Sequence, residues 1–195
     1  MTFSFLFAKK QVMVAAIIYL AAYLIASFLD LSTTALALQR SAAHEGNVFV
    51  TDAQTYMSAR AWIITAGAGL TMVGCVVFAV SNAGRVEDAW LRRPMRSFAV
   101  FYVNPWAPAA IGKSPLHMLS FAIAFVAMRL LAAANNVLIH VYGFAPIGGP
   151  IEWIARRSSP VFGFAAVIVP LFYVLAIAVS PLAARMIVAW RNPPA

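Results

Sequence analysis

The sequence predicts an all-α membrane protein, a single transmembrane domain over residues 1–195 in which four helices form a bundle. Composition is the first reason: 63% of the residues are hydrophobic and 10% are charged, whereas an ordinary soluble domain has roughly 25% charged residues. The second reason is that the apolar residues come in long blocks separated by short polar stretches, as in helices that cross a bilayer. Because a crossing takes about 20 residues, four blocks are long enough to span a membrane.

The predicted spans cover residues 11–38, 56–80, 116–141 and 161–190. The apolar run from Val12 to Leu29 exceeds the roughly 7–15 residues of a signal-peptide core, so we expect it to be retained as the first span. Pro170 and Pro181 should kink the fourth span, because each removes a backbone donor. Between the third and fourth spans, Pro150 predicts the first turn of a short helix through Arg157.

Lysine and arginine residues predict the orientation of the chain. Nine lie on the side of the two termini: Lys9, Lys10, Arg85, Arg92, Arg93, Arg96, Lys113, Arg185 and Arg191. Four lie on the opposite side: Arg40, Arg60, Arg156 and Arg157. Since cytoplasmic connections carry the excess of basic residues, both termini and the connection 81–115 are predicted to be cytoplasmic. We expect a multi-pass protein of a bacterial inner (plasma) membrane.

The connection 81–115 is expected to lie on the membrane surface. Its segment VEDAWLRRPMRSFAVFYVNPW alternates basic and aromatic residues, which favours an interfacial amphipathic helix. The residues expected to contact lipid or a partner are Arg92, Arg93, Arg96, Trp90 and Trp106. Anchoring to anionic headgroups is the simplest interpretation, and docking of another membrane subunit or a second copy is the alternative. The basic residues flank apolar blocks and form no arginine-rich tail, so no nucleic-acid partner is expected.

Charged residues inside the spans are few, and each costs about 2.5–3.5 kcal/mol at the bilayer centre. At about 1.5 Å per residue, Asp30 lies roughly 30 Å along the first span and Arg129 roughly 24 Å along the third, counted from the cytoplasmic ends. Both therefore fall toward the outer side.

Helical spacing gives the first three spans one polar or small face each. On the third span the face comprises Arg129, Ala133, Asn136 and His140. On the first span it comprises Tyr19, Tyr23, Ser27, Asp30 and Thr34. On the second span it comprises Arg60, Gly67, Thr71 and Gly74, whose small residues permit close helix contact. We expect these three faces to look at one another.

These faces, with the connection after the first span, predict a polar cluster at the outer mouth of the bundle. Its members are Asp30, Thr34, Glu45, Asn47, Arg60, Arg129, Asn136 and His140. Two carboxylates and two guanidiniums nearly balance in charge. Such a cluster can lock helices together through ion pairs, and it leaves little free charge for a solute.

The run FLDLSTTALALQRSAAHEGN has an aspartate at the end of the first span, a threonine four residues on, and a Glu-x-Asn motif about ten residues later: Asp30, Thr34, Glu45 and Asn47. Over about 40 residues this resembles the signature of a family of small, functionally uncharacterised bacterial and archaeal membrane proteins. Arg60 takes the place of a basic residue that opens the family's second span, while Val48 replaces its proline. The resemblance implies a fold and a polar cluster, and no activity.

Catalytic and cofactor motifs are not evident in the sequence, and we expect neither cofactor nor metal. Cys75 is the single cysteine, which excludes an intramolecular disulfide and a CxxC pair. His44 and Glu45 lack the second histidine of a zinc-peptidase helix. His117 and His140 lie at opposite ends of the third span, which disfavours a bis-histidine haem.

Three classes of function remain. The favoured one is a non-catalytic accessory or assembly subunit of a larger membrane complex, in which the polar cluster is structural. The second is a transporter or channel for a small polar solute or ion, suggested by Arg129 and the prolines of the fourth span. The third is an intramembrane enzyme that acts on lipid or uses a metal, to which His140 could contribute a ligand.

Overall fold

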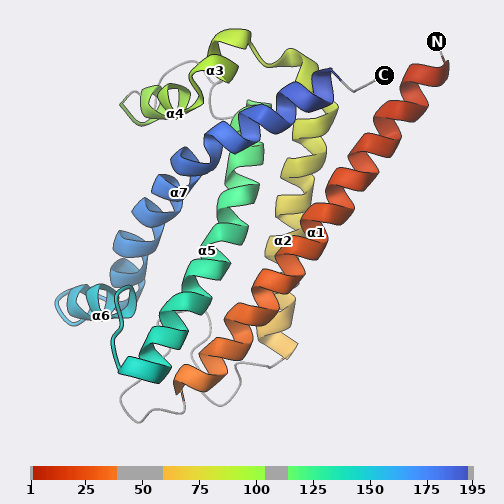
Figure 1. Cartoon of the computed structure of the whole chain (residues 1–195). Coiled ribbons are helices and arrows are strands. Elements are labelled where there is room, and N and C mark those ends of the chain that lie inside the picture. Colours follow the sequence, from red (N-terminus) through yellow and green to blue (C-terminus); the bar gives the residue numbers. More distant parts are fainter. Residues whose placement is uncertain (1, 39–58, 104–113, 193–195) are drawn as a thin grey trace. The chain divides into compact units, whose positions relative to one another are not determined.

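The computed structural model describes residues 2–38, 59–103 and 114–192, and every regular element in these ranges is helical (Figure 1). The elements are α1 (Thr2–Leu38), α2 (Ala59–Ser81), the 3-10 turn η1 (Ala83–Arg85), α3 (Asp88–Arg92), α4 (Pro94–Val103), α5 (Pro115–Tyr142), α6 (Gly148–Ala155) and α7 (Pro160–Arg191). Four helices, α1, α2, α5 and α7, are long and apolar enough to cross a membrane. The predicted all-α class with four candidate membrane-spanning helices is confirmed.

Proline and glycine mark where the long helices begin and end. Pro115 and Pro160 occupy the first turns of α5 and α7, where the missing N–H of proline costs nothing. Ser114 caps the start of α5, its Oγ accepting the N–H of Leu116 at 3.2 Å. α5 ends at Tyr142 and is followed by Gly143, which has a φ of 67° and donates its N–H to the carbonyl of Ile139 at 2.9 Å. A left-handed residue at this position is the usual helix stop, and glycine adopts it without strain.

The chain folds as two compact units. Unit 1 comprises Met1–Ala22, Gly69–Phe125 and Tyr173–Ala195, and unit 2 comprises Tyr23–Ala68 and Val126–Phe172. Each long helix therefore contributes one part of its length to each unit.

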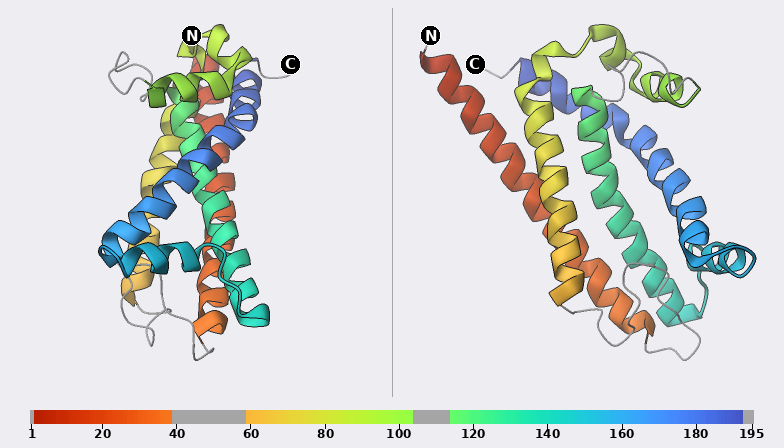
Figure 2. Two further views of the ribbon diagram at one scale, coloured as in Figure 1. Left: turned by 90° about the vertical axis from the view of Figure 1, so that its left-hand side faces the viewer. Right: turned by 180° about the vertical axis from the view of Figure 1, so that it is seen from behind.

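In unit 1, the predicted amphipathic helix of the 81–115 connection is two helices, α3 and α4. The break falls at Arg93, with φ −135° and ψ 60°, because a residue before proline is kept out of the helical region. α4 packs on the start of α5, where Phe98 and His117 are both 1% exposed and their rings lie 4.2 Å apart. The first turns of α1 and the last turns of α7 lie at the same end of unit 1 as α3 and α4 (Figure 2).

In unit 2, the short helix α6 is held by α5 and by the start of α7. Asn135 Oδ1 accepts the N–H of Ile147, the residue before α6, at 3.0 Å. A Cβ added at Gly163 of α7 would lie 2.6 Å from the carbonyl oxygen of Ile151, so glycine permits this close approach. Pro150 lies in the first turn of α6 as predicted, although the helix ends at Ala155 rather than at Arg157.

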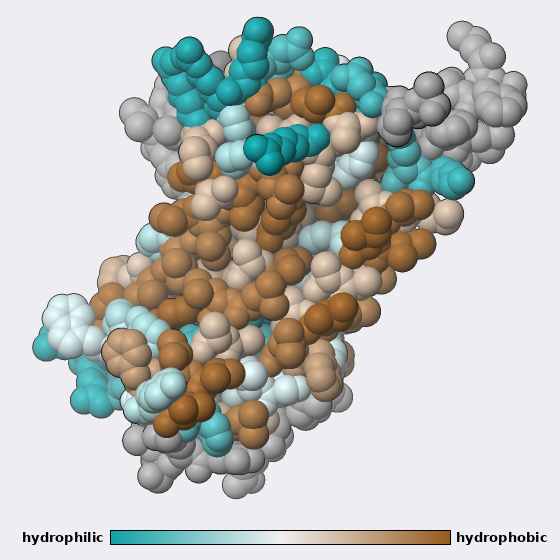
Figure 3. All heavy atoms as spheres, viewed as in Figure 1, coloured by the Kyte–Doolittle hydropathy of each residue, from teal (hydrophilic) through white to brown (hydrophobic). Residues whose placement is uncertain are grey.

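Large apolar side chains are exposed on all four long helices, including Ile18 (64%), Leu70 (70%), Leu130 (46%) and Val174 (61%). Brown, hydrophobic residues cover much of the face drawn in Figure 3. Soluble proteins rarely leave so much contiguous apolar surface in water, so this exposure fits a protein surrounded by lipid.

The buried face of α2 differs from the expected one. Gly67, Thr71 and Gly74 are exposed, and a Cβ built at either glycine meets no atom within 4 Å. The buried positions instead include Thr65 (3% exposed), Val76 (2%) and Ala79 (0%). The expectation that the small-residue face looks toward the other spans is therefore wrong for these three residues.

Candidate functional site

The centre of the candidate site is an ion pair between α1 and α5 in unit 2. Arg129 Nη1 donates to Asp30 Oδ2 at 2.7 Å, and the two side chains are 19% and 12% exposed. Either charge buried alone would carry a large desolvation cost, which the partner charge offsets when further hydrogen bonds satisfy both groups. The sequence placed both residues on facing polar stripes, and the structure brings them together.

The Asn136 amide and the Thr34 hydroxyl extend the hydrogen bonding around Asp30. Asn136 Nδ2 donates to Thr34 Oγ1 at 2.8 Å and lies 3.5 Å from Asp30 Oδ1. The Thr34 hydroxyl in turn donates to the main-chain carbonyl of Asp30 at 2.8 Å. Thr34 thus accepts one hydrogen bond and donates another, so its single O–H is engaged. Both carboxylate oxygens of Asp30 face donors on α5.

His140 continues the same helix interface beyond Asn136. Its Nδ1 lies 2.8 Å from the main-chain carbonyl oxygen of Leu36. A carbonyl oxygen only accepts, so Nδ1 carries the proton in this contact. Asp30, Thr34, Arg129, Asn136 and His140 therefore join the ends of α1 and α5, five of the eight predicted site residues.

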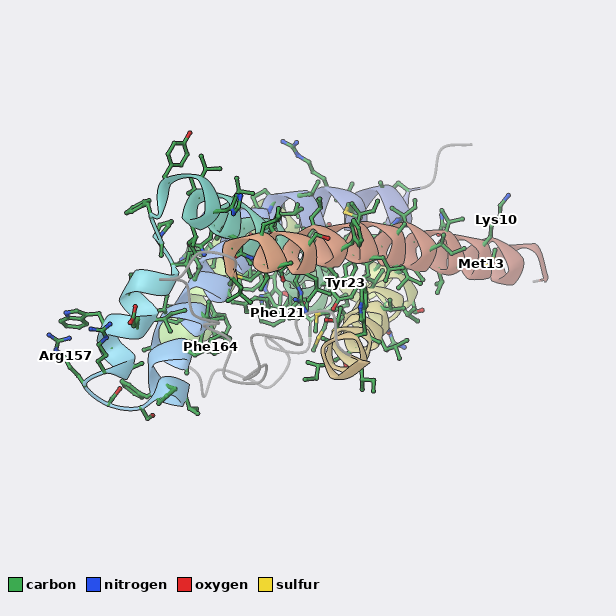
Figure 4. The ribbon with its side chains drawn as sticks, turned by 90° about the horizontal axis from the view of Figure 1, so that it is seen from below. Lys10, Met13, Tyr23, Phe121, Arg157 and Phe164 are labelled. Atoms are coloured by element: carbon green, nitrogen blue, oxygen red, sulfur yellow. The ribbon has the colours of Figure 1, made fainter. Side chains whose placement is uncertain are left out.

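Thr65 of α2 also belongs to the site, although the sequence did not predict it. Thr65 Oγ1 accepts from Arg129 Nη2 at 3.4 Å, and its main-chain carbonyl accepts the Tyr23 hydroxyl at 2.6 Å. The hydroxyl of Tyr23, 1% exposed on α1 (Figure 4), also interacts with the Arg129 guanidinium. Tyr23 was on the predicted polar stripe, whereas Thr65 stands among apolar residues on the face of α2 opposite to expectation. A lone threonine hydroxyl in that run was the available signal.

One member of the α1 stripe is unsatisfied. Ser27 is fully buried, and its Oγ has no hydrogen-bond partner within the part of the chain that the structure describes. It lies between Tyr23 and Asp30 on the same helix face. An unmade hydrogen bond at a buried hydroxyl costs about 1–3 kcal/mol.

Three predicted members of the polar cluster lie, wholly or in their side chains, outside the described residues. Glu45 and Asn47 lie outside the described residues, as does Trp106 of the predicted lipid contacts. Arg60 lies in the first turn of α2, and its side chain is outside the described part.

The other predicted lipid contacts belong to unit 1. Arg92, Arg93 and Arg96 are exposed on and between α3 and α4. Trp90 is half-buried and stacks on His117 with ring centroids 5.8 Å apart. The tryptophan thus packs against α5, while the arginines remain at the surface.

Among the described residues, no three His, Cys, Asp or Glu side chains come together as a metal site. Comparisons with protein-family models, curated proteins and solved structures find no match to this chain. Asp30, Thr34, Arg129 and Asn136 bond to one another across two helices, so binding a substrate here would require breaking contacts that hold the helices together.

Proposed function

We propose that this protein is a non-catalytic accessory or assembly subunit of a larger complex in a bacterial inner membrane. The observation that carries the proposal is the reciprocal bonding of the polar cluster, in which Arg129 serves Asp30 on α1 and Thr65 on α2. A charge-compensated network of this kind fixes the relative positions of three helices. The role of this network is then to hold the spans in one rigid arrangement that partner proteins recognise.

The proposal includes a four-helix bundle with both termini in the cytoplasm and the 81–115 connection at the cytoplasmic surface. The bias of nine basic residues against four supports this orientation. The exposed arginines Arg92, Arg93 and Arg96 support an interfacial position for α3 and α4. On the opposite side, Arg157 points away from the ribbon beyond α6 (Figure 4), with its guanidinium 4.1 Å from the ring centroid of Trp153. Paired arginine and tryptophan side chains suit the headgroup region.

The resemblance of the Asp30–Thr34 and Glu45–Asn47 motifs to a family of small prokaryotic membrane proteins agrees with this proposal. Membership of the family stays a prediction.

The test is gentle detergent extraction of the tagged protein from its native membrane, followed by identification of what co-purifies. The accessory role predicts a membrane protein at stoichiometric amounts, which is absent from a parallel purification of an unrelated tagged multi-pass protein. Recovery of this chain as a pure, partnerless species would contradict the accessory role.

A second candidate is a transporter or channel for a small polar solute or ion, favoured by Arg129 within a candidate span and by the unsatisfied hydroxyl of Ser27, which lies on the same face of α1 as Asp30. A water-filled route past Arg129 would make residue 27 accessible to aqueous reagents. Ser27→Cys in a Cys75→Ala background tests this with a small hydrophilic thiol reagent. Labelling in intact membranes would favour transport, and protection of the thiol until denaturation would favour the structural role.

A further inference from the structure

A cavity of about 360 Å³ lies in unit 1, between the α3–α4 segment and the last turns of α7. One wall comes from α3 and α4, through Leu91, Arg92 and Pro94. The other wall comes from α7, through Pro181, Ala184, Arg185 and Val188. The cavity is large enough for a small polar group with its linker, and it belongs to neither the polar cluster nor the buried packing around His117.

Each wall contributes one arginine and otherwise only apolar groups. Arg92 and Arg185 are both exposed, so their guanidiniums remain hydrated and available to a ligand. Guanidinium groups bind phosphate through paired, charge-assisted hydrogen bonds. Two arginines on opposite walls of an otherwise apolar cavity therefore fit an anionic group attached to an apolar body.

The nearby carboxylates do not neutralise these arginines. Asp88, one turn before Arg92 on α3, accepts from Arg191 Nη1 at 2.7 Å. Among the described residues, no carboxylate lines the cavity and neither Arg92 nor Arg185 has a salt-bridge partner. The ion pair between Asp88 and Arg191 ties α3 to α7 and leaves the cavity with a positive charge.

The surface around the cavity changes from polar to apolar. Figure 3 shows hydrophilic residues gathered over α3 and α4, directly beside hydrophobic residues of the same unit. On α7, Leu182 and Val188 are 51% and 43% exposed next to the cavity wall. An amphiphile could place its charged group between the arginines and its chains along this apolar surface. Free phosphate would gain nothing from the apolar wall.

We propose that this cavity binds the phosphate headgroup of an anionic phospholipid. Arg92 and Arg185 hold the phosphate from opposite sides, and the exposed apolar residues of α7 contact the acyl chains. The inference rests on the proposed position of α3 and α4 at the cytoplasmic membrane surface. The α3–α4 segment thereby has one defined lipid site, in place of basic residues that bind headgroups at no particular position.

The experiment titrates the purified full-length protein in detergent with phosphatidylglycerol and counts bound lipid by native mass spectrometry. The test variants are Arg92→Gln, Arg185→Gln and the pair together. The matched control is Arg156→Gln with Arg157→Gln, which removes the same charge from exposed arginines of unit 2. Phosphatidylcholine and inorganic phosphate serve as the neutral-lipid and free-anion probes. Thermal unfolding confirms that each variant is folded.

We expect one tightly bound phosphatidylglycerol, with affinity reduced roughly fivefold for each cavity arginine removed and unchanged in the control. Lysine at both positions should retain part of the binding, since the charge remains while the paired hydrogen bonds of the guanidinium are lost. Equal binding of phosphatidylcholine, efficient competition by inorganic phosphate, or equal loss in the control pair would each overturn the proposal. Lipid binding in detergent depends on neither a partner nor the orientation, so its failure is distinguishable from failure of the accessory role.

Discussion

The buried pair of Asp30 and Arg129 is the most consequential feature at the scale of single residues. Removing two charges from water costs several kcal/mol per ion, and an apolar surrounding offers no other compensation than the partner. The 2.7 Å contact provides it, and Thr65 and Asn136 satisfy the remaining groups. Because of this desolvation cost, the ion pair contributes less to the free energy of unfolding than the attraction between its two charges would suggest. It makes each partner indispensable to the other.

The first prediction follows from this dependence. Asp30→Asn or Arg129→Gln alone should lower the free energy of unfolding by about 3–5 kcal/mol, because one charge is left uncompensated. The double variant should be less destabilised than the sum of the two. Thermal unfolding of the purified variants in one detergent measures both effects. Additive losses would mean that the two residues act independently, contrary to the pair in the structure.

Residue spacing predicted the two charges of this site but not all of their partners. Asp30, Thr34, Arg129 and Asn136 could be recognised because ionisable and amide groups are rare and expensive inside apolar spans. Thr65 was not predicted because a threonine in a membrane helix costs little free energy, since its hydroxyl can bond to its own backbone. Whether Thr65 reaches Arg129 depends on the rotation of α2 about its axis. That rotation depends in turn on which side chains of α1 and α5 pack against α2.

At the scale of elements, apolar length was sufficient to predict the long helices, and the ends of α5 and α7 each differ from the prediction by one residue. Rotation about a helix axis was harder to predict. Gly67 and Gly74 suggested a packing face on α2, yet burial follows Thr65 and Val76. Small residues permit close contact without requiring it. Likewise, Pro94 was visible in the sequence, and its effect on Arg93 explains why one expected helix is two.

The second prediction contrasts two glycines in long helices. Gly163→Ala should destabilise the protein and loosen α6 from α7, because the new Cβ would lie 2.6 Å from the Ile151 carbonyl and 2.8 Å from the Ala155 nitrogen. Gly74→Ala, where a Cβ meets nothing within 4 Å, should be neutral or stabilising by up to about 1 kcal/mol. Thermal unfolding midpoints compare the two. A lower midpoint for the Gly74 variant than for the Gly163 variant would refute the proposed packing.

The third prediction concerns the attachment of α4 to α5. Phe98→Ala should release this contact, since Phe98 is 1% exposed and packs on His117 and on Phe121, with ring centroids 5.8 Å apart in the latter pair. Deleting such a ring from a soluble core costs about 3–5 kcal/mol. Limited proteolysis should then cut residues 81–115 faster. Met95→Ala, at a position 49% exposed on the same helix, is the control and should leave the rate unchanged.

At the scale of the whole molecule, the proposed orientation follows from where basic residues gather. Five of the 14 lysine and arginine residues lie on or between α3 and α4 or in the last turns of α7: Arg92, Arg93, Arg96, Arg185 and Arg191. Arg156 and Arg157 lie in the turn that follows α6. In the proposed arrangement the cytoplasmic side holds the lipid-facing cations, and the outer side is closed by the polar cluster. The single cysteine makes this arrangement accessible to labelling.

The fourth prediction tests that orientation in a Cys75→Ala background. Ser158→Cys, at an exposed site after α6, should react with a membrane-impermeant maleimide in spheroplasts, because the outer side faces the reagent. Gly84→Cys, exposed in η1 with open space around its Cβ, should react only in inside-out vesicles. The cysteine-free parent gives the background. The reverse pattern would place the termini outside, and it would require the basic residues of α3 and α4 to face the outer surface against the usual charge rule. Labelling of both sites from one side would instead mean that α5, the candidate span between them, does not cross the membrane.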